Sequence, residues 1–258
     1  MLRFPLRLTA DIARARLLRI LRLAPDVSPV RIVDVAEILH HDSNHPVSHE
    51  KIREIVSSRS PVVWIGGSEP LHHPGVSHLV RAITQTGHFV FLETDGTHLR
   101  RRIHEFQPVS RLFLTVRVEP GAQRRTSKGL RAGAFELAEE GMRAARLSGF
   151  LICVHARIHA ETELAEIAGL IQFASSFDVD GIVITPANGG ANSAIPDAAA
   201  LERKTAEARK LIGSQWALFS KIVEPEVSTE RYSAPSSQEI DVRIQQEARA
   251  NEEGVKVA

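Results

Sequence analysis

The segment after the apolar run 61–66 carries the residues best suited to holding a ligand. It spells GGSEPLHHP and contains Gly66, Gly67, Glu69 and Pro70. The two glycines let a ligand approach the backbone closely, because a side chain there would block it. Glu69 is suited to meeting an ammonium group, and Pro70 fixes the turn into the next helix. These residues predict a tight loop for a small charged ligand; a glycine-rich turn that binds nothing is the alternative.

Charged and polar side chains also follow the other apolar runs. In a barrel of β/α units, the groups just past the carboxyl ends of the strands carry the chemistry. In chain order, these groups are Glu93, Thr94, Asp95, Gly96, Arg117, Glu119, His155, Arg157 and Thr185. The first run, 31–39, is followed by HHDSNHPVSH, which holds His41 and Asp42. We expect all of these positions to lie around one barrel mouth.

The elements that must position these residues alternate along residues 31–187. Apolar runs lie at 31–39, 61–66, 88–94, 111–118, 150–158 and 181–186, with amphipathic segments between them. Near-continuous apolar strands are typical of a parallel sheet that is covered on both faces. Gly87, Gly149 and Gly181 mark returns from helix to strand, where a left-handed residue ends a helix. The pattern predicts an α/β fold, a (β/α)6 partial barrel; a doubly wound sheet is the alternative.

Two flanking segments differ from this core, which gives three expected regions: 1–30, 31–222 and 223–258. Residues 2–23 hold six arginines and one aspartate among apolar residues. They predict a helix that Thr9 caps and that ends at Leu23. This helix either packs on the base of the barrel or lies on anionic lipid. Residues 223–258 are polar and predict a mobile tail.

Composition limits the classes of protein that remain. The chain has 258 residues with 32 basic and 31 acidic side chains, so its net charge of +1 gives no field for nucleic acid. No apolar run reaches the roughly 18–20 residues of a membrane-spanning helix, and the amino terminus lacks a secretory signal. We therefore expect a cytoplasmic protein. The single cysteine, Cys153, excludes a disulfide framework and a cysteine-only metal cage.

The order and spacing of several motifs resemble the radical S-adenosylmethionine superfamily over residues 31–187. The stretch WIGGSEPLHHPGVSHLVRAITQTGHFVFLETDGTHL is similar to the family's GGEP loop, helix and TNG-ended strand. The stretch from LFLTVRVEPG to FLICVHARI resembles the fourth unit and the strand after it. More weakly, MLRFPLRLTADIARARLL is similar to the opening of bacterial hopanoid-biosynthesis members. The resemblance implies the (β/α)6 partial barrel of that family, with S-adenosylmethionine and a [4Fe–4S] cluster as its cofactors.

The resemblance also implies roles for particular positions. Gly66, Gly67, Glu69 and Pro70 stand where the family holds the methionyl amino group. The family's TNG end corresponds to Thr94, Asp95 and Gly96, with aspartate in place of asparagine. Contacts to ribose and carboxylate correspond to the region of Arg117, Glu119 and His155, and residues 181–187 pass near the adenine.

One departure from the family decides the functional expectation. The family's CxxxCxxC loop follows the first strand, but that place here contains no cysteine. A protein-held cluster normally needs three or four thiolates. Cys153 lies within a strand and is expected to be a small buried apolar residue. We therefore expect a pseudoenzyme, or a binder of S-adenosylmethionine or a related nucleotide that performs no radical chemistry.

Two other functions remain open at this point. A metal-dependent lyase or hydrolase would use histidines and carboxylates at the barrel mouth, for which His41, Asp42, Glu69 and His73 are the candidates. A non-catalytic scaffold would offer the barrel, the basic helix and the tail to a partner protein or a membrane surface. The arginines at 100–102 are expected to form a solvated face.

Overall fold

The structure is a computed structural model, and it describes residues 4–23, 27–38, 48–121, 132–187 and 198–223. All of these belong to one compact unit of the chain. The predictions for His41, Asp42 and the polar tail lie outside the described residues.

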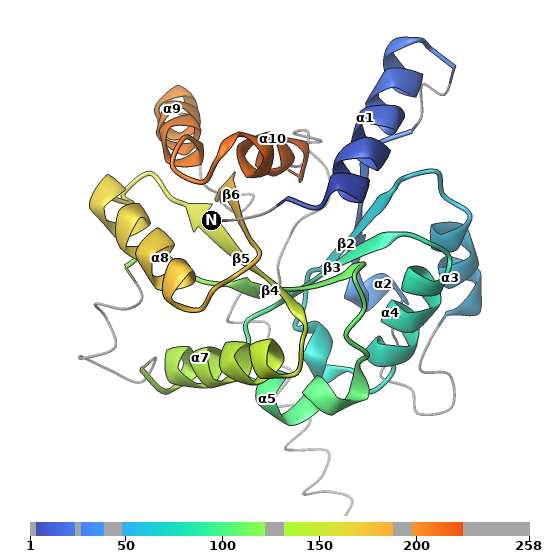
Figure 1. The fold of residues 1–258 in the computed structure, drawn as a ribbon, viewed down its shortest axis with the longest axis horizontal. Coiled ribbons are helices and arrows are strands. Elements are labelled where there is room, and N and C mark those ends of the chain that lie inside the picture. Colours follow the sequence, from blue (N-terminus) through green and yellow to red (C-terminus); the bar gives the residue numbers. More distant parts are fainter. Residues whose placement is uncertain (1–3, 24–26, 39–47, 122–131, 188–197, 224–258) are drawn as a thin grey trace, which may run out of the picture. The chain divides into compact units, whose positions relative to one another are not determined.

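Six parallel strands form the sheet, in the order in which they occur along the chain. They are β1 (Val30–Asp34), β2 (Val62–Gly66), β3 (Phe89–Thr94), β4 (Leu112–Arg117), β5 (Leu151–Ile158) and β6 (Gly181–Pro186). Sequential order makes every β/α connection step to the neighbouring strand, so the sheet curls in one sense. We call this curled sheet the half-barrel (Figure 1). The predicted α/β class and (β/α)6 partial barrel are confirmed.

Helices cover both faces of this sheet (Figure 1). The described helical segments are α1 (Leu6–Ile20), α2 (Val35–Ile38), α3 (His49–Val56), η1 (Pro70–His72), α4 (Val76–Gln85), α5 (Leu99–Arg102), η2 (Ile103–Glu105), α7 (Ala132–Leu147), α8 (Leu164–Ser176), α9 (Ala198–Arg209) and α10 (Ser214–Val223). One strand boundary was wrong in the sequence-based prediction. β1 ends at Asp34, not at residue 39, because the Asp34 carboxylate accepts the backbone N–H of Ala36 and starts α2.

Three stacked aromatic rings form one layer of the inner face of the half-barrel. Trp64, Phe91 and Phe113 are register partners on β2, β3 and β4. The ring centroids are 5.6 Å apart between Trp64 and Phe91 and 4.5 Å apart between Phe91 and Phe113, and both pairs are nearly parallel. We call these three side chains the aromatic floor. Because alternate residues of a strand share a face, the next inward positions toward the carboxyl ends are Gly66, Glu93 and Thr115.

Helix α10 closes the inner face beneath this floor. Its Phe219 ring lies 4.8 Å from the Phe91 ring, and its Trp216 ring lies 6.2 Å from the Phe113 ring. α10 contacts both edge strands, β1 and β6, as the curl of the sheet requires. Gly181 fits against this helix, since a Cβ at that position would collide with the Trp216 ring.

The role expected of Gly181 was therefore wrong, whereas those of Gly87 and Gly149 are confirmed. Gly87 and Gly149 adopt φ values of 98° and 80°, as left-handed helix ends require. Gly181 is absent from the positive-φ glycines of the described chain, and its small size instead gives Trp216 room.

The edge of β6 is sealed by side chains. The backbone N–H of Ile184 donates to Ser220 Oγ at 3.0 Å, and the Ile184 carbonyl accepts from Arg209 Nε at 2.9 Å. An open edge strand invites pairing with another chain, so these two bonds remove a docking edge.

Helix α1 begins earlier than the sequence predicted. Pro5 is its N-cap residue, and Thr9 lies inside the first turns, where its hydroxyl donates to the Pro5 carbonyl at 3.2 Å. Leu8, Ile12 and Ala15 are buried, and Phe4 packs on Trp216. Among the described helices, none is long and apolar enough to cross a membrane.

The contact between Gly181 and Trp216 yields a stability prediction. We expect Gly181→Ala to lower the free energy of unfolding by about 1–3 kcal/mol, because the new methyl group must displace a packed ring. Gly133→Ala is the matched control, since a Cβ at Gly133, in α7, meets no atom within 4 Å. Urea denaturation of both variants is the measurement. Equal stability of Gly181→Ala and wild type would contradict the packing described here.

Candidate functional site

A buried carboxylate stands at the centre of the barrel mouth. The Glu93 side chain, near the end of β3, is only 6% exposed. Its Oε2 accepts the indole N–H of Trp64 at 2.9 Å. Its Oε1 lies 3.2 Å from His155 Nδ1. The carboxylate therefore rests on the aromatic floor and links β2, β3 and β5.

Two arginines complete the surroundings of this carboxylate. Arg117 Nη1 lies 3.3 Å and Arg157 Nη2 lies 3.2 Å from Glu93 Oε1. Burial raises the pKa of Glu93, but the His155 hydrogen bond and the charges of His155, Arg157 and Arg117 outweigh that effect and hold the pKa well below its usual range. Glu93 is therefore an anion at neutral pH.

His155, Arg117 and Arg157 differ in their access to solvent. The His155 side chain is 6% exposed, and its Nε2 lies 2.8 Å from Thr185 Oγ1 on β6. The side chains of Arg117 and Arg157 are 26% and 40% exposed. The histidine is thus enclosed, whereas both guanidinium groups reach the surface of the mouth.

Thr115 Oγ1 adds an unsatisfied polar atom to the inner face. It is buried and has no hydrogen-bond partner among the described residues. Thr115 is the register partner of Glu93, so it occupies the same level of the half-barrel. Leaving a buried hydroxyl unpaired costs about 1–3 kcal/mol, which a water molecule or a ligand atom at this level would recover.

The predicted ligand loop after β2 is tied firmly to the end of β3. Glu69 Oε1 accepts from Thr94 Oγ1 at 2.6 Å and from the Leu71 N–H at 3.0 Å, and Oε2 accepts the Asp95 N–H at 2.8 Å. Glu69 thereby caps η1, which begins at Pro70. The carboxylate that the sequence assigns to an ammonium group thus already accepts three hydrogen bonds within the protein.

A second clamp on this loop comes from α5. Arg102 donates to the Leu71 carbonyl and, at 2.9 Å, to the His73 carbonyl, and its guanidinium also pairs with Glu105. Its side chain is 15% exposed. The expectation of a solvated arginine face at 100–102 is therefore wrong for Arg102, which holds the two carbonyls in place.

The glycines of the loop bring backbone and carboxylates close together. A Cβ at Gly66 would lie 2.8 Å from Glu93 Oε2, and one at Gly67 would collide with the Asp34 carboxylate. Gly67 also adopts a φ of 92°, which favours glycine. Within the described residues, carboxylates of the protein itself approach both glycines closely. The approach of a ligand to this backbone stays a prediction.

The remaining predicted residues do not all lie together in the structure. Asp95 joins the Glu69 bonds through its backbone N–H, while its carboxylate accepts from the N–H and hydroxyl of Thr97. Gly96 packs against Ala138 of α7 with a φ of 82°. Glu119 pairs with His159 at 3.3 Å, apart from the contacts that surround Glu93. Glu69, Thr94 and Asp95 therefore form one cluster, while Glu93 and His155 form another.

The described residues do not form a metal site. No group of three or more His, Cys, Asp or Glu side chains in the described ranges is placed to hold an ion. His73 is buried, and its Nδ1 accepts the Gly75 N–H at 3.0 Å, which turns that nitrogen away from an ion. The predicted co-ligands His41 and Asp42 lie outside the described residues.

The sequence alone indicated some of these residues more clearly than others. Glu93, Arg117 and Arg157 were recognisable as charges in otherwise apolar strands, but their convergence on one carboxylate was missed. Trp64 and Asp34 were missed as site residues because each resembles an ordinary part of its strand. The register supplies the missing signal, since it pairs Ile32 with Trp64 and Asp34 with Gly66.

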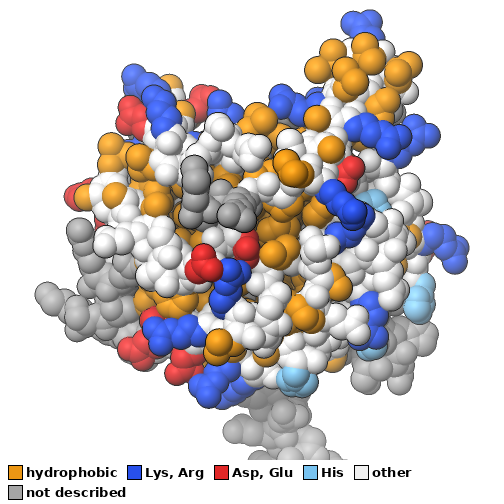
Figure 2. Space-filling model, viewed as in Figure 1, with side chains coloured by type: hydrophobic (Ala, Val, Ile, Leu, Met, Phe, Trp, Pro, Cys, Tyr) orange, Lys and Arg blue, Asp and Glu red, His pale blue; other side chains and the backbone are white. Residues whose placement is uncertain are grey.

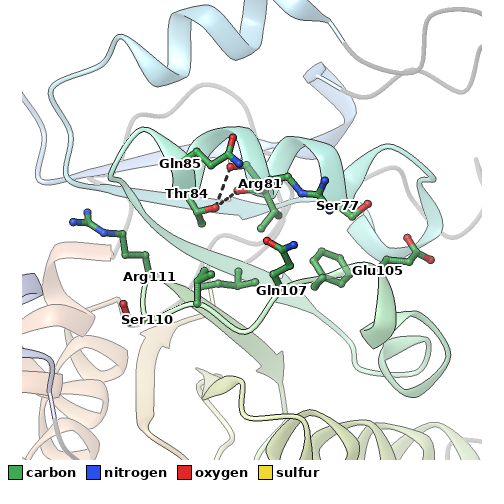
Figure 3. A pocket seen from close by; sticks show the side chains of 12 residues that line it. Ser77, Arg81, Thr84, Gln85, Glu105, Gln107, Ser110 and Arg111 are labelled. Atoms are coloured by element: carbon green, nitrogen blue, oxygen red, sulfur yellow. Dashed lines mark hydrogen bonds between the residues drawn. The ribbon is translucent and has the colours of Figure 1, made fainter.

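A separate pocket lies between α4 and the segment that leads into β4 (Figure 3). Its volume is about 270 Å³, and its lining comes from α4 and from residues 105–112, which lead into β4. Val80, Phe106 and Leu112 form part of its lining, with Arg81 and Arg111 among the charged side chains. It contains none of the predicted site residues, so we keep the candidate site at the mouth.

Solved structures of two other proteins are similar to this chain in the arrangement of their elements. A structure of Streptococcus suis SuiB bound to S-adenosylmethionine is 10% identical with a TM-score of 0.47, over 72% of this chain and 48% of that one. Archaeal TYW1 is 17% identical with a TM-score of 0.40, over 54% of this chain and 47% of that one. The chain thus spans about half the length of these structures. No family model and no curated protein matches the sequence.

At these low identities and scores, the fold assignment rests on the strand order and register of this chain. The resemblance to the radical S-adenosylmethionine superfamily stays a prediction beyond the fold. So does the similarity of the amino terminus to hopanoid-biosynthesis proteins.

The buried position of Glu93 yields a pH-dependent stability prediction. We expect Glu93→Gln to lower the free energy of unfolding at pH 7 by about 2 kcal/mol, because it removes the charge that an indole N–H, a histidine and two arginines face. The depressed pKa of Glu93 contributes stability that is complete above the unfolded-state value of about 4.3 and is lost as the pH falls below it. The gap between wild type and Glu93→Gln should therefore narrow in acid.

Urea denaturation between neutral pH and pH values below the unfolded-state pKa measures this gap. Glu54→Gln is the control, since Glu54 pairs with Arg31 at the surface and should change stability little. A gap that is absent at neutral pH, or that widens in acid, would contradict the described environment of Glu93.

Proposed function

We propose that the barrel mouth binds a small zwitterionic molecule, S-adenosylmethionine or a related nucleotide, and that the chain performs no radical chemistry with a cluster of its own. The observation that carries the proposal is the pair of half-exposed arginines, Arg117 and Arg157, held over a buried anion beside the Gly66–Gly67 loop. Such a mouth offers cationic and anionic points within one opening, which suits a ligand bearing both an ammonium group and a carboxylate.

The residues of this chain do not fit a [4Fe–4S] cluster. The sequence contains one cysteine, whereas such a cluster normally takes three or four thiolates. Cys153 is fully buried within β5, and burial raises the pKa of its thiol well above the usual range. A buried neutral thiol is a poor metal ligand. No step of the proposed function therefore involves an iron–sulfur cluster.

The arginines supply the carboxylate-binding part of the proposal. Each guanidinium has five N–H donors, and in the described contacts each uses one of them on Glu93. The remaining donors of Arg117 and Arg157 are available for the carboxylate of a ligand. Glu93 keeps both guanidinium groups at the mouth, so their positions are set before a ligand arrives.

The loop after β2 supplies the part of the proposed site that binds the positively charged group of the ligand. The Glu69 side chain is half-buried on this side, and the Asp34 carboxyl group lies beside Gly67. Gly66 and Gly67 present backbone without side chains between these carboxylates. A methionyl ammonium or sulfonium group is attracted to this side, which agrees with the role that the family resemblance implies for Gly66, Gly67, Glu69 and Pro70.

Two alternative functions receive less support. A metal-dependent lyase or hydrolase needs ligands from His41 and Asp42, and the described residues form no metal-holding group without them. A scaffold without a small-molecule ligand gives the buried Thr115 hydroxyl no hydrogen-bond partner among the described residues. Metal analysis distinguishes the first alternative, and the titration below distinguishes the second.

Isothermal titration calorimetry with S-adenosylmethionine tests the proposal. The protein concentration should detect a dissociation constant of about 1 mM, which corresponds to roughly −4 kcal/mol. We expect an Arg117→Gln/Arg157→Gln variant to bind about tenfold more weakly, because a charged hydrogen bond to the ligand carboxylate is lost. Arg143→Gln, on the exposed side of α7, is the control and should bind normally.

Decarboxylated S-adenosylmethionine gives the sharper comparison. It lacks the carboxylate, so the arginine variant and wild type should bind it equally. A Glu69→Ala variant is unsuitable here, since it also breaks the three hydrogen bonds that hold the loop. No binding of S-adenosylmethionine to wild type, or an equal loss of both ligands in the arginine variant, would refute the proposed site.

A further inference from the structure

Helix α1 has an apolar side that the half-barrel does not cover. Its buried residues Leu8, Ile12 and Ala15 recur at four- and three-residue spacing and form the inward side. Leu6, Ala10, Ala13 and Leu17 recur at the same spacing, and each lies two positions along the chain from one of the buried residues. Two residues turn an α-helix by about 200°, so this second set lies on the opposite side of α1. All four of its members are exposed.

The exposed side chains are large as well as apolar. Leu6 is 83% exposed and Leu17 is 54% exposed. Beyond Leu17, Ile20 and Leu21 are 75% and 56% exposed, and Leu23 is 69% exposed. We call Leu6, Ala10, Ala13, Leu17, Ile20, Leu21 and Leu23 the outer stripe of α1. In Figure 2, hydrophobic side chains gather at the upper right, where Figure 1 places this helix.

The end of α1 keeps this stripe exposed. The N–H of Arg22 donates to the Arg19 carbonyl at 3.1 Å, and the N–H of Leu23 donates to the Leu18 carbonyl at 3.0 Å. Arg22 adopts a φ of 54°, a left-handed conformation in which glycine is usual. This turn ends the helix with Leu21 and Leu23 in solvent, although a non-glycine residue is unfavourable there.

Basic side chains flank the outer stripe on both sides. By helix geometry, Arg7 and Arg14 lie along one border and Arg16 along the other, and all three are exposed. Asp11 is the single acidic residue of 2–23, and it lies toward the buried side. Figure 2 shows Lys and Arg side chains beside the hydrophobic ones in this region.

We infer that α1 docks the protein on an anionic lipid bilayer, with the outer stripe in the boundary between headgroups and acyl chains. A helix of this kind lies in the plane of the membrane, with its apolar side buried and its arginines on lipid phosphates. The charge pattern favours lipid over a second copy of the chain. A two-fold dimer through the same stripe would bring like-charged arginines together.

Sedimentation of the 258-residue chain with vesicles tests this inference. The vesicles are phosphatidylcholine alone or phosphatidylcholine with roughly 30% phosphatidylserine. We expect binding to the anionic vesicles that is at least tenfold stronger than to the neutral ones, and that weakens at roughly 0.5 M salt as charges are screened. Equal binding to both kinds of vesicle, or none to the anionic kind, would overturn the inference.

Matched variants separate the outer stripe from general surface properties. The stripe variant is Leu17→Ser/Ile20→Ser/Leu21→Ser, and its control is Leu147→Ser/Leu211→Ser, at positions that are 90% and 52% exposed elsewhere. The charge variant is Arg7→Gln/Arg14→Gln/Arg16→Gln, and its control is Arg53→Gln/Arg59→Gln/Arg101→Gln, which are exposed arginines outside α1. We expect each α1 variant to bind anionic vesicles at least tenfold more weakly, and the controls to bind as wild type.

Circular dichroism is the check that the variants fold, and we expect them to do so because every substituted side chain is exposed. Analytical ultracentrifugation provides the competing outcome. A dimer that the stripe variant dissociates, together with vesicle binding that the variant does not change, would assign the stripe to a second copy and overturn the lipid inference.

Discussion

The arrangement of the mouth depends on one buried anion, the carboxylate of Glu93. Burying a charge is costly unless partners compensate it, and here an indole N–H, a histidine and two arginines do so. The same contacts fix the partners: His155 is drawn inward, while Arg117 and Arg157 stay at the surface. The two arginines of the proposed ligand site are therefore held in place by a carboxylate of the protein.

The layers beneath this anion explain why it can be held. Trp64 belongs to the aromatic floor and also donates to Glu93, so packing and charge compensation share one side chain. α10 supports the floor from below through Phe219 and Trp216, and Gly181 gives Trp216 its space. The loop after β2 is fixed independently, by Glu69 on one side and Arg102 on the other. The mouth thus rests on contacts from β2, β3, β4, β5, α5 and α10.

The sequence predicted the fold more completely than the site. Apolar runs and glycine positions placed the strands closely, because burial on both faces leaves a strong one-dimensional pattern. The sequence-based prediction was wrong about the end of β1 at Asp34, the start of α1 near Thr9 and the role of Gly181. At these positions a helix cap or a ring from a distant part of the chain decides the structure. The convergence of residues on Glu93 depends on register across four strands, which no local pattern records. Arg102 was misjudged for the same reason, since its carbonyl partners are some thirty positions away.

Direct observation of the Glu93 charge tests the central claim best. The measurement is a ¹³C NMR titration of side-chain carboxyl groups, with the Glu93 resonance assigned by its absence in Glu93→Gln. The account predicts that this resonance keeps the shift of an ionised carboxylate from neutral pH down to the onset of acid unfolding. A midpoint near the ordinary glutamate value of about 4.3 would contradict it. In that case the arginines would not be organised by a buried anion, and the mouth would lack the basis described here.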